Sequence, residues 1–305
     1  MARVNDGNLS SDPMDAPFRD GTQTASAVLD RQIGSILGEL RNLSVDDVER
    51  ILAHQRESGV RFGEAAVALG LASSDDVLLA LAQQFHYPYA PEARRRLSAE
   101  LIALSQPFSM QAESMRAMRS QLISRMGLEG EMRRAMAVVS PNSGDGKTFL
   151  AANLAVGMAQ LGGRTLLVDA DLRGPRQHQL FNLSNTAGLS GILAGRPESN
   201  VIQQVPDVPS LFVLPVGITP PNPLELVERP AFAMLMRELC EKFDHVIVDT
   251  PAAEYGADAT VVAARCGAAL VVARKNRSSV RALQDLVGTL ADGPAKLAGV
   301  IMNEF

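Results

Sequence analysis

The segment that most constrains the fold is AMAVVSPNSGDGKTFLAANLA, residues 135–155. It consists of a short apolar run, a loop of small and turn-forming residues, and a helical pattern that begins at Gly-Lys-Thr. Backbone N–H groups converge where such a loop enters a helix, and they bind phosphate oxygens there. The segment therefore predicts a strand, a phosphate-binding loop and a helix.

The same loop carries the side chains that phosphate chemistry requires. Lys147 is placed to reach the β- and γ-phosphate oxygens, and the Thr148 hydroxyl is placed to bind Mg²⁺. The pattern GxxxxGK[ST] is not fully met, because Pro141 occupies the first glycine position. An incidental GKT at a helix cap is the alternative interpretation. The predicted nucleotide-binding residues are Ser143, Gly144, Asp145, Gly146, Lys147, Thr148 and Asn303.

Apolar runs typical of buried strands alternate with helical patterns over the C-terminal part of the chain. This alternation predicts an α/β P-loop NTPase fold with a mostly parallel, twisted sheet. The predicted strands are 135–140, 165–169, 211–216, 245–249, 268–273 and 297–303.

Three carboxylates follow or end two of these apolar runs. Asp169 and Asp171 lie in TLLVDADLRGPR, and Asp249 ends DHVIVD. Open α/β sheets bind ligands at the carboxyl ends of their strands, although a single Asp there is more often a turn or cap residue. We expect Asp249 to contact Mg²⁺ through water and Asp169 to orient or deprotonate an attacking hydroxyl. The predicted metal-site residues are Thr148, Asp169 and Asp249.

The N-terminal part contains an internal repeat. Residues 32–55 align with 61–84 at an offset of 29, and pairs such as Ser44 with Ser73 and Asp47 with Asp76 are identical. Each unit has the pattern of a helix, a turn, an Asp-containing N-cap and a second helix. The repeat predicts a small helical domain before the P-loop domain.

Composition shifts predict four regions. Three prolines and a run of arginines at 94–96 indicate a connector after the repeat. We expect a disordered lead over 1–28, the helical repeat domain over 29–90, a linker over 91–108 and the P-loop domain over 109–305.

Charge and apolar patterning exclude several classes of protein. The net charge of −5 argues against a general nucleic-acid binder. No apolar stretch reaches the roughly 18 residues that a membrane span needs. The two cysteines, Cys240 and Cys266, have neither disulfide-scaffold nor zinc-site spacing. We therefore expect a cytoplasmic protein without a nucleic-acid partner.

Four motifs together resemble the bacterial tyrosine kinases (BY-kinases). They are the Walker A loop SPNSGDGKT, the DxDxR motif from Asp169 to Arg173, the DTP motif at Asp249, and ExxRxxR within 113–119. The resemblance implies an ATP- and Mg²⁺-dependent protein-tyrosine kinase, a transferase with the catalytic residues Lys147, Asp169, Asp171 and Arg173. Arg173 could steady the transferred phosphate, and the alternative interpretation is that it forms only a surface ion pair. The family uses ExxRxxR for subunit contact, which implies a homo-oligomer with contacts through Glu113, Arg116 and Arg119.

The resemblance extends to the EpsG-like kinases of exopolysaccharide chain-length control, through phrases such as PPNPLELV and DTPAAEYGADA. It implies a role in exopolysaccharide biosynthesis, chain length or export. It also implies recruitment to the inner membrane by a membrane chain-length determinant protein. BY-kinases commonly end in a tyrosine cluster, whereas this chain has only Tyr87, Tyr89 and Tyr255. Packing is the favoured role for Tyr255, with a phosphate acceptor as the alternative.

A MinD/ParA-like ATPase switch is the alternative function, since it shares the P-loop but transfers the phosphate to water. Those switches carry a lysine early in the loop, where this chain has Asn142. This difference favours the kinase.

The second repeat resembles the cyclic-di-GMP-binding motif of the N-terminal domain of type II secretion ATPases (MshEN-like). The matching positions are Arg61, Gly63, Gly70 and Gln84. The first repeat is weaker, with Gln32 and Arg41 at two of these positions. The resemblance implies cyclic-di-GMP as a possible ligand and a responsive adaptor as a further alternative function. Docking of a protein partner is the alternative role for this domain, and the sequence favours it equally or slightly more than cyclic-di-GMP binding.

Overall fold

The computed structural model describes residues 33–84, 96–126, 134–206 and 208–304. Its contacts divide the chain into two units, Met1–Tyr87 and Pro88–Phe305. Each unit is described below by itself.

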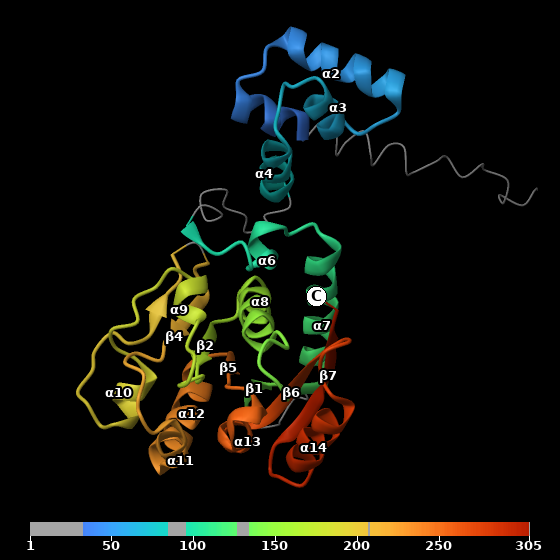
Figure 1. The fold of residues 1–305 in the computed structure, drawn as a ribbon. Helices are drawn as coiled ribbons and strands as arrows, with labels where there is room; N and C mark the ends of the chain where they lie inside the picture. The colour runs from blue at the N-terminus through green and yellow to red at the C-terminus, as the bar shows by residue number, and fades with distance from the viewer. Residues whose placement is uncertain (1–32, 85–95, 127–133, 207, 305) are drawn as a thin grey trace, which may run out of the picture. The chain divides into compact units, whose positions relative to one another are not determined.

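The N-terminal unit is helical (Figure 1). Residues 33–41 form a helix, which is followed by α2 (Val45–Ser58), α3 (Phe62–Ala68) and α4 (Ser74–Gln84). Its small core is built around buried Leu37, Ile51 and Phe62. Gly63 permits the approach of α3 to α4, because a Cβ at this position would lie 2.5 Å from Cγ1 of Val77.

The second helix of each predicted repeat starts in the same way. The backbone N–H and the hydroxyl of Ser44 donate to Asp47, and the Asp47 N–H donates back to the Ser44 hydroxyl. Ser73 and Asp76 make the same three hydrogen bonds. Reciprocal capping of this kind satisfies N–H groups that a helix start would otherwise leave unpaired. It accounts for the recurrence of Ser and Asp at this spacing, while a duplicated domain stays a prediction.

The C-terminal unit is built on one sheet of seven described strands, in the order β3-β4-β2-β5-β1-β6-β7. The six longer strands pair in parallel, and short β3 pairs with β4 in the antiparallel sense. The mostly parallel sheet is confirmed, and β3 is the strand that the sequence did not predict. The bounds are β1 Ala135–Val139, β2 Thr165–Asp169, β3 Gln203–Gln204, β4 Leu211–Leu214, β5 His245–Asp249, β6 Gly267–Arg274 and β7 Lys296–Asn303.

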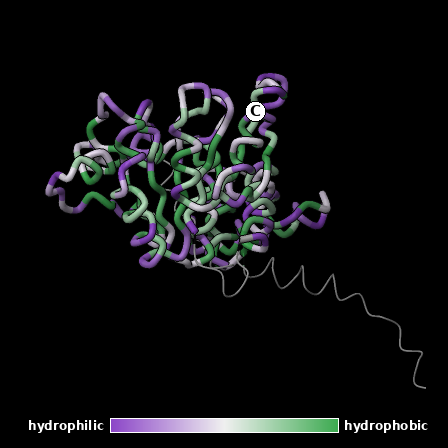
Figure 2. Tube along the Cα trace, turned by 90° about the horizontal axis from the view of Figure 1, so that it is seen from below, coloured by the Kyte–Doolittle hydropathy of each residue, from purple (hydrophilic) through white to green (hydrophobic). Residues whose placement is uncertain are grey.

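Helices cover both faces of this sheet. Alternate residues of β1 point to opposite faces: Val139 belongs to one buried cluster and Val138 to the other. The first cluster includes side chains from α12 (Pro230–Lys242), α13 (Asp258–Cys266) and α14 (Val280–Ala291). The second includes side chains from α7 (Met110–Met126) and α8 (Lys147–Ala159). Hydrophobic segments accordingly run through the interior of the trace (Figure 2).

Short helices complete the unit: α6 (Ile102–Ser105), α9 (Gln177–Leu180), α10 (Leu189–Leu193), α11 (Pro223–Glu228) and the 3-10 helix η1 (Ala253–Tyr255). The segment predicted as a linker contains α6, and its Leu101 side chain is fully buried. The Ala103 N–H donates to Oδ1 of Asn153 on α8 at 3.0 Å. The described part of this segment therefore packs on the α/β unit. Among the described helices, none combines the length and the apolar character needed to cross a bilayer.

Candidate nucleotide-binding site

The loop between β1 and α8 has the backbone of a phosphate-binding loop. Gly144 and Gly146 have φ angles of 77° and 100°, a region in which residues with a Cβ are strained. A Cβ on Gly146 would also collide with the Asn303 side chain at the end of β7. The first glycine of the usual pattern, replaced here by Pro141, is thus not needed for this backbone.

Asp145 braces the loop from within. Its fully buried carboxylate accepts hydrogen bonds from the Asn142 N–H at 2.9 Å and from the Ser278 hydroxyl at 2.7 Å. Its backbone oxygen accepts a hydrogen bond from Nδ2 of Asn303 at 3.0 Å. The structure therefore brings the predicted site residues Asp145 and Asn303 together, with the Asp145 side chain shaping the loop.

Glu254, which the sequence analysis missed, holds the start of the loop. Its carboxylate accepts the Ser143 N–H at 2.6 Å and the Asn142 side-chain amide at 3.1 Å. The hydrogen bond from Ser143 is the main cause that lowers the pKa of Glu254. Because the Ser143 N–H is already engaged, we expect the phosphate-binding donors to start at Gly144.

Asp169 and Asp249 lie side by side at the carboxyl ends of β2 and β5. They are register partners on these adjacent strands, and both are fully buried. Burial and the charge of Asp249 raise the pKa of Asp169 well above its usual value. Burial also raises the pKa of Asp249 to about 6, although the nearby Lys147 charge opposes this shift. The structure thus brings Lys147 and the two predicted carboxylates into one site.

Asp171 and Arg173 lie in the turn after β2. Oδ1 of Asp171 accepts the backbone N–H groups of Arg173 and Gly174, at 3.2 and 2.9 Å. The Arg173 guanidinium makes two hydrogen bonds to the carboxylate of Asp258, at 3.2 and 3.0 Å. The Asp258 side chain is 4% exposed, so this is a partly buried ion pair rather than a surface one. A phosphate contact by Arg173 would have to share or break it.

The aspartates at the carboxyl ends of β2 and β5 fit a magnesium ion that is bound jointly by the protein and a nucleotide. Oδ1 of Asp249 is buried and has no hydrogen-bond partner among the described residues. The Thr148 side chain lies near the Asp249 carboxylate and opposes the rise of its pKa. Within the described ranges, no three His, Cys, Asp or Glu side chains form a metal cluster by themselves. Mg²⁺ commonly takes one or two carboxylates plus phosphate and water oxygens, which agrees with this donor set.

Gln177, on α9, is a second residue that the sequence analysis missed. Its Nε2 donates to Oδ2 of Asp249 at 2.9 Å and to the backbone oxygen of Thr148 at 3.1 Å. The residue lies far from both partners in the sequence and in no recognised motif, so no sequence signal pointed to it.

The ExxRxxR helix is α7. Arg116 donates to Glu113 at 2.8 Å and to the backbone oxygen of Pro107 at 2.7 Å. Arg119 donates to the backbone oxygen of Gly157, on α8 of the same chain, at 2.7 Å. These contacts anchor α7 within its own unit, and of the three motif residues only Glu113 is largely exposed.

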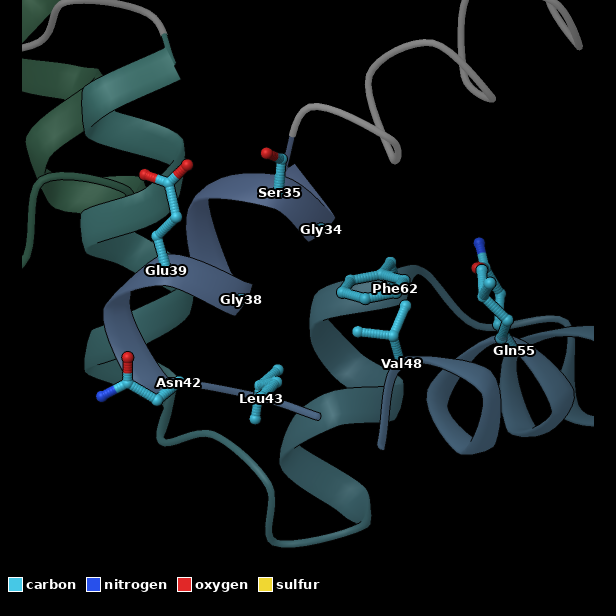
Figure 3. A pocket seen from close by; sticks show the side chains of 10 residues that line it. Gly34, Ser35, Gly38, Glu39, Asn42, Leu43, Val48, Gln55 and Phe62 are labelled. Carbon is cyan, nitrogen blue, oxygen red and sulfur yellow. The ribbon is translucent and has the colours of Figure 1, made fainter. Parts of the chain in front are cut away.

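Two of the predicted cyclic-di-GMP residues, Gly63 and Gly70, have structural roles in the N-terminal unit. Gly63 packs under Val77, and Gly70 has a φ of 69° just after α3. A groove of about 800 Å³ in this unit lies instead against helix 33–41, with Phe62 opposite Gly34 (Figure 3). It is lined by Gly34, Ser35, Gly38, Glu39, Asn42, Leu43, Val48, Leu52, Gln55 and Phe62.

The parallel sheet, the glycine-containing loop after β1 and the acidic ends of β2 and β5 define a P-loop nucleotide-binding domain. The family profile described as the CobQ/CobB/MinD/ParA nucleotide binding domain matches residues 136–305.

Within this class, the chain belongs to the bacterial tyrosine-protein kinase family. It is 35% identical to tyrosine-protein kinase YwqD of Bacillus subtilis (strain 168) over 208 residues, which are 68% of this chain and 87% of YwqD. The kinase domain of the Escherichia coli tyrosine kinase ETK superposes with a TM-score of 0.63 at 34% identity, covering 67% of this chain and 79% of that one. Tyrosine-protein kinase ptk of Acinetobacter johnsonii is 30% identical over 212 residues, 70% of this chain, but the match spans only 29% of ptk.

Proposed function

We propose that this chain is an ATP-dependent protein-tyrosine kinase. The observation that carries the proposal is the pair of buried carboxylates, Asp169 and Asp249, next to a P-loop with a buried Lys147. Family membership supports the same reaction, since relatives such as YwqD and ETK are named tyrosine kinases.

Each group has a defined task in the proposed transfer. The loop N–H groups and Lys147 bind and orient the ATP phosphates. The tyrosine oxygen bonds to the γ-phosphorus, and the bond between this phosphorus and the oxygen that stays with ADP breaks. Asp169 accepts the proton that the tyrosine hydroxyl loses. Thr148 and Asp249 hold Mg²⁺, which neutralises charge on the phosphates.

The test of this proposal is incubation of the purified chain with γ-labelled ATP. We expect label on tyrosine, located by phosphopeptide mapping. Tyr255 is one candidate acceptor, because the residue is 53% exposed in η1. Steady release of free phosphate without phosphotyrosine on the chain or on an added partner would favour the ATPase switch instead.

The partner and the location are proposed on the same basis. Large apolar side chains, Phe108 and Met110, are exposed at the start of α7, where a subunit or partner could cover them. The proposed contacts are a second copy of the chain, through α7, and a membrane chain-length determinant protein. This partner would recruit a cytoplasmic kinase to the inner membrane and link it to exopolysaccharide production.

The N-terminal unit carries a separate proposal, the binding of cyclic-di-GMP through Arg61, Gly63, Gly70 and Gln84. Arg61 is exposed at the start of α3, where its guanidinium can meet a phosphate. Titration calorimetry of the full chain with cyclic-di-GMP is expected to show binding that Arg61→Ala weakens at least about tenfold, the effect of losing one charged hydrogen bond. Arg56→Ala, at the exposed end of α2, is the matched control. No heat at high micromolar ligand would leave partner docking as the role of this unit.

A further inference from the structure

Gln177 is fully buried between the parts of the nucleotide site that come from distant segments. Its backbone N–H donates to Oδ2 of Asp169 at 3.0 Å. Its side-chain Nε2 donates to Oδ2 of Asp249 and to the backbone oxygen of Thr148. A single residue thus ties together the end of β2, the end of β5 and the first turn of α8.

These contacts fix the orientation of the Asp249 carboxylate and of the Thr148 backbone. With Oδ2 of Asp249 bonded to Gln177, the orientation of this carboxylate is fixed, and Oδ1 is the oxygen without a partner among the described residues. Fixing the Thr148 backbone also fixes the position from which its hydroxyl projects. The two groups assigned to magnesium are therefore held by the same side chain.

The oxygen of the Gln177 side chain is a second observation that points to a ligand. Oε1 is buried and lacks a donor among the described residues, next to a site that already contains two carboxylates. Buried polar atoms are normally hydrogen-bonded, and outer residues around a metal usually bond its ligands or its waters.

We infer that Gln177 is a positioning residue for the divalent cation, holding Asp249 and Thr148 in the geometry that binds it. This inference rests on the proposed use of Mg·ATP. It differs from a packing role, because it requires the amide of Gln177 and not only the volume of the side chain.

The test uses Mn²⁺ as the probe cation, with free Mn²⁺ counted by electron paramagnetic resonance in the presence of ADP and the full chain. Gln177→Met keeps the volume and removes both the donor and the acceptor. We expect Mn²⁺ affinity to fall by about 10–100-fold, the usual cost of losing such a partner. ADP affinity measured in EDTA should change less than about twofold, because the phosphate-binding loop is retained. Gln179→Met, on the exposed side of the same short helix, is the matched control and should bind Mn²⁺ like the parent.

Parental Mn²⁺ affinity in Gln177→Met would overturn the inference. An equal loss of ADP affinity in EDTA, with a lower melting temperature, would also overturn it by assigning Gln177 a purely structural role. If Gln177→Met does not fold, the same measurement on Gln177→Asn decides, since this shorter amide stays polar but falls short of Asp249. A parent chain that binds neither Mn²⁺ nor ADP would instead refute the proposed function.

Discussion

Replacing Lys147 by alanine is expected to lower ATP turnover by at least about 100–1000-fold, the cost of losing one well-placed group that stabilises transition-state charge. Lys147 is the first residue of α8, it is 6% exposed, and its charge already acts on the buried Asp249. Without it, the phosphates lose their buried cation while the two carboxylates remain. Release of labelled phosphate and transfer of label to protein are the measurements.

Two further variants make this result specific. Lys147→Met keeps the length and removes the charge, so it should lose turnover as fully as the alanine variant. Lys242→Ala, at the exposed end of α12, changes the net charge equally and should keep the parental rate. Turnover at the parental rate in both Lys147 variants would show that the site is assigned to the wrong residues.

Asp169→Asn is expected to lower the rate of phosphotyrosine formation by about 100-fold or more, the usual contribution of a general base. The amide has the size of the carboxylate, and its oxygen can still accept the N–H groups of Arg176 and Gln177 that bond Oδ2 now, while the Asp171 N–H loses its acceptor, Oδ1. Nucleotide binding should therefore persist while proton transfer is lost. Quantified phosphotyrosine and, separately, ADP affinity are the measurements.

Asp285→Asn, on the exposed side of α14, serves as the carboxylate control. If Asp169→Asn kept its phosphotyrosine label, a different group would have to take the hydroxyl proton. If it lost nucleotide binding as well, Asp169 would be a structural group whose charge the site cannot lose.

Local sequence patterns were sufficient for the framework of the site. The strands at 165–169 and 245–249 have the predicted bounds, because in each a run of three apolar residues ends in an aspartate. Since both strands are parallel and adjacent, their aspartates necessarily meet at one edge. The positions of the loop glycines were equally predictable from the sequence, because the left-handed backbone of this loop requires glycine there.

The residues that brace the site were not predictable in this way. Glu254 bonds a loop residue 111 positions earlier in the chain, and Gln177 bonds Asp249 across 72 positions. Neither residue stands out by type or spacing, because a glutamate after a strand or a glutamine in a short helix is usually exposed.

The hydrogen bond from Asn303 to the nucleotide loop has a consequence for protein synthesis. The loop lies between β1 and α8, but β1 pairs with β5 and β6, and Asn303 lies 158 residues beyond Asp145, the loop residue that it bonds. At about 5–20 residues per second, the ribosome adds Asn303 roughly 8–30 s after Lys147. A nascent chain therefore exposes its Gly-Lys-Thr segment long before the loop can close. Ribosome-bound chains should accordingly be unable to capture ATP until almost all of the α/β unit has emerged.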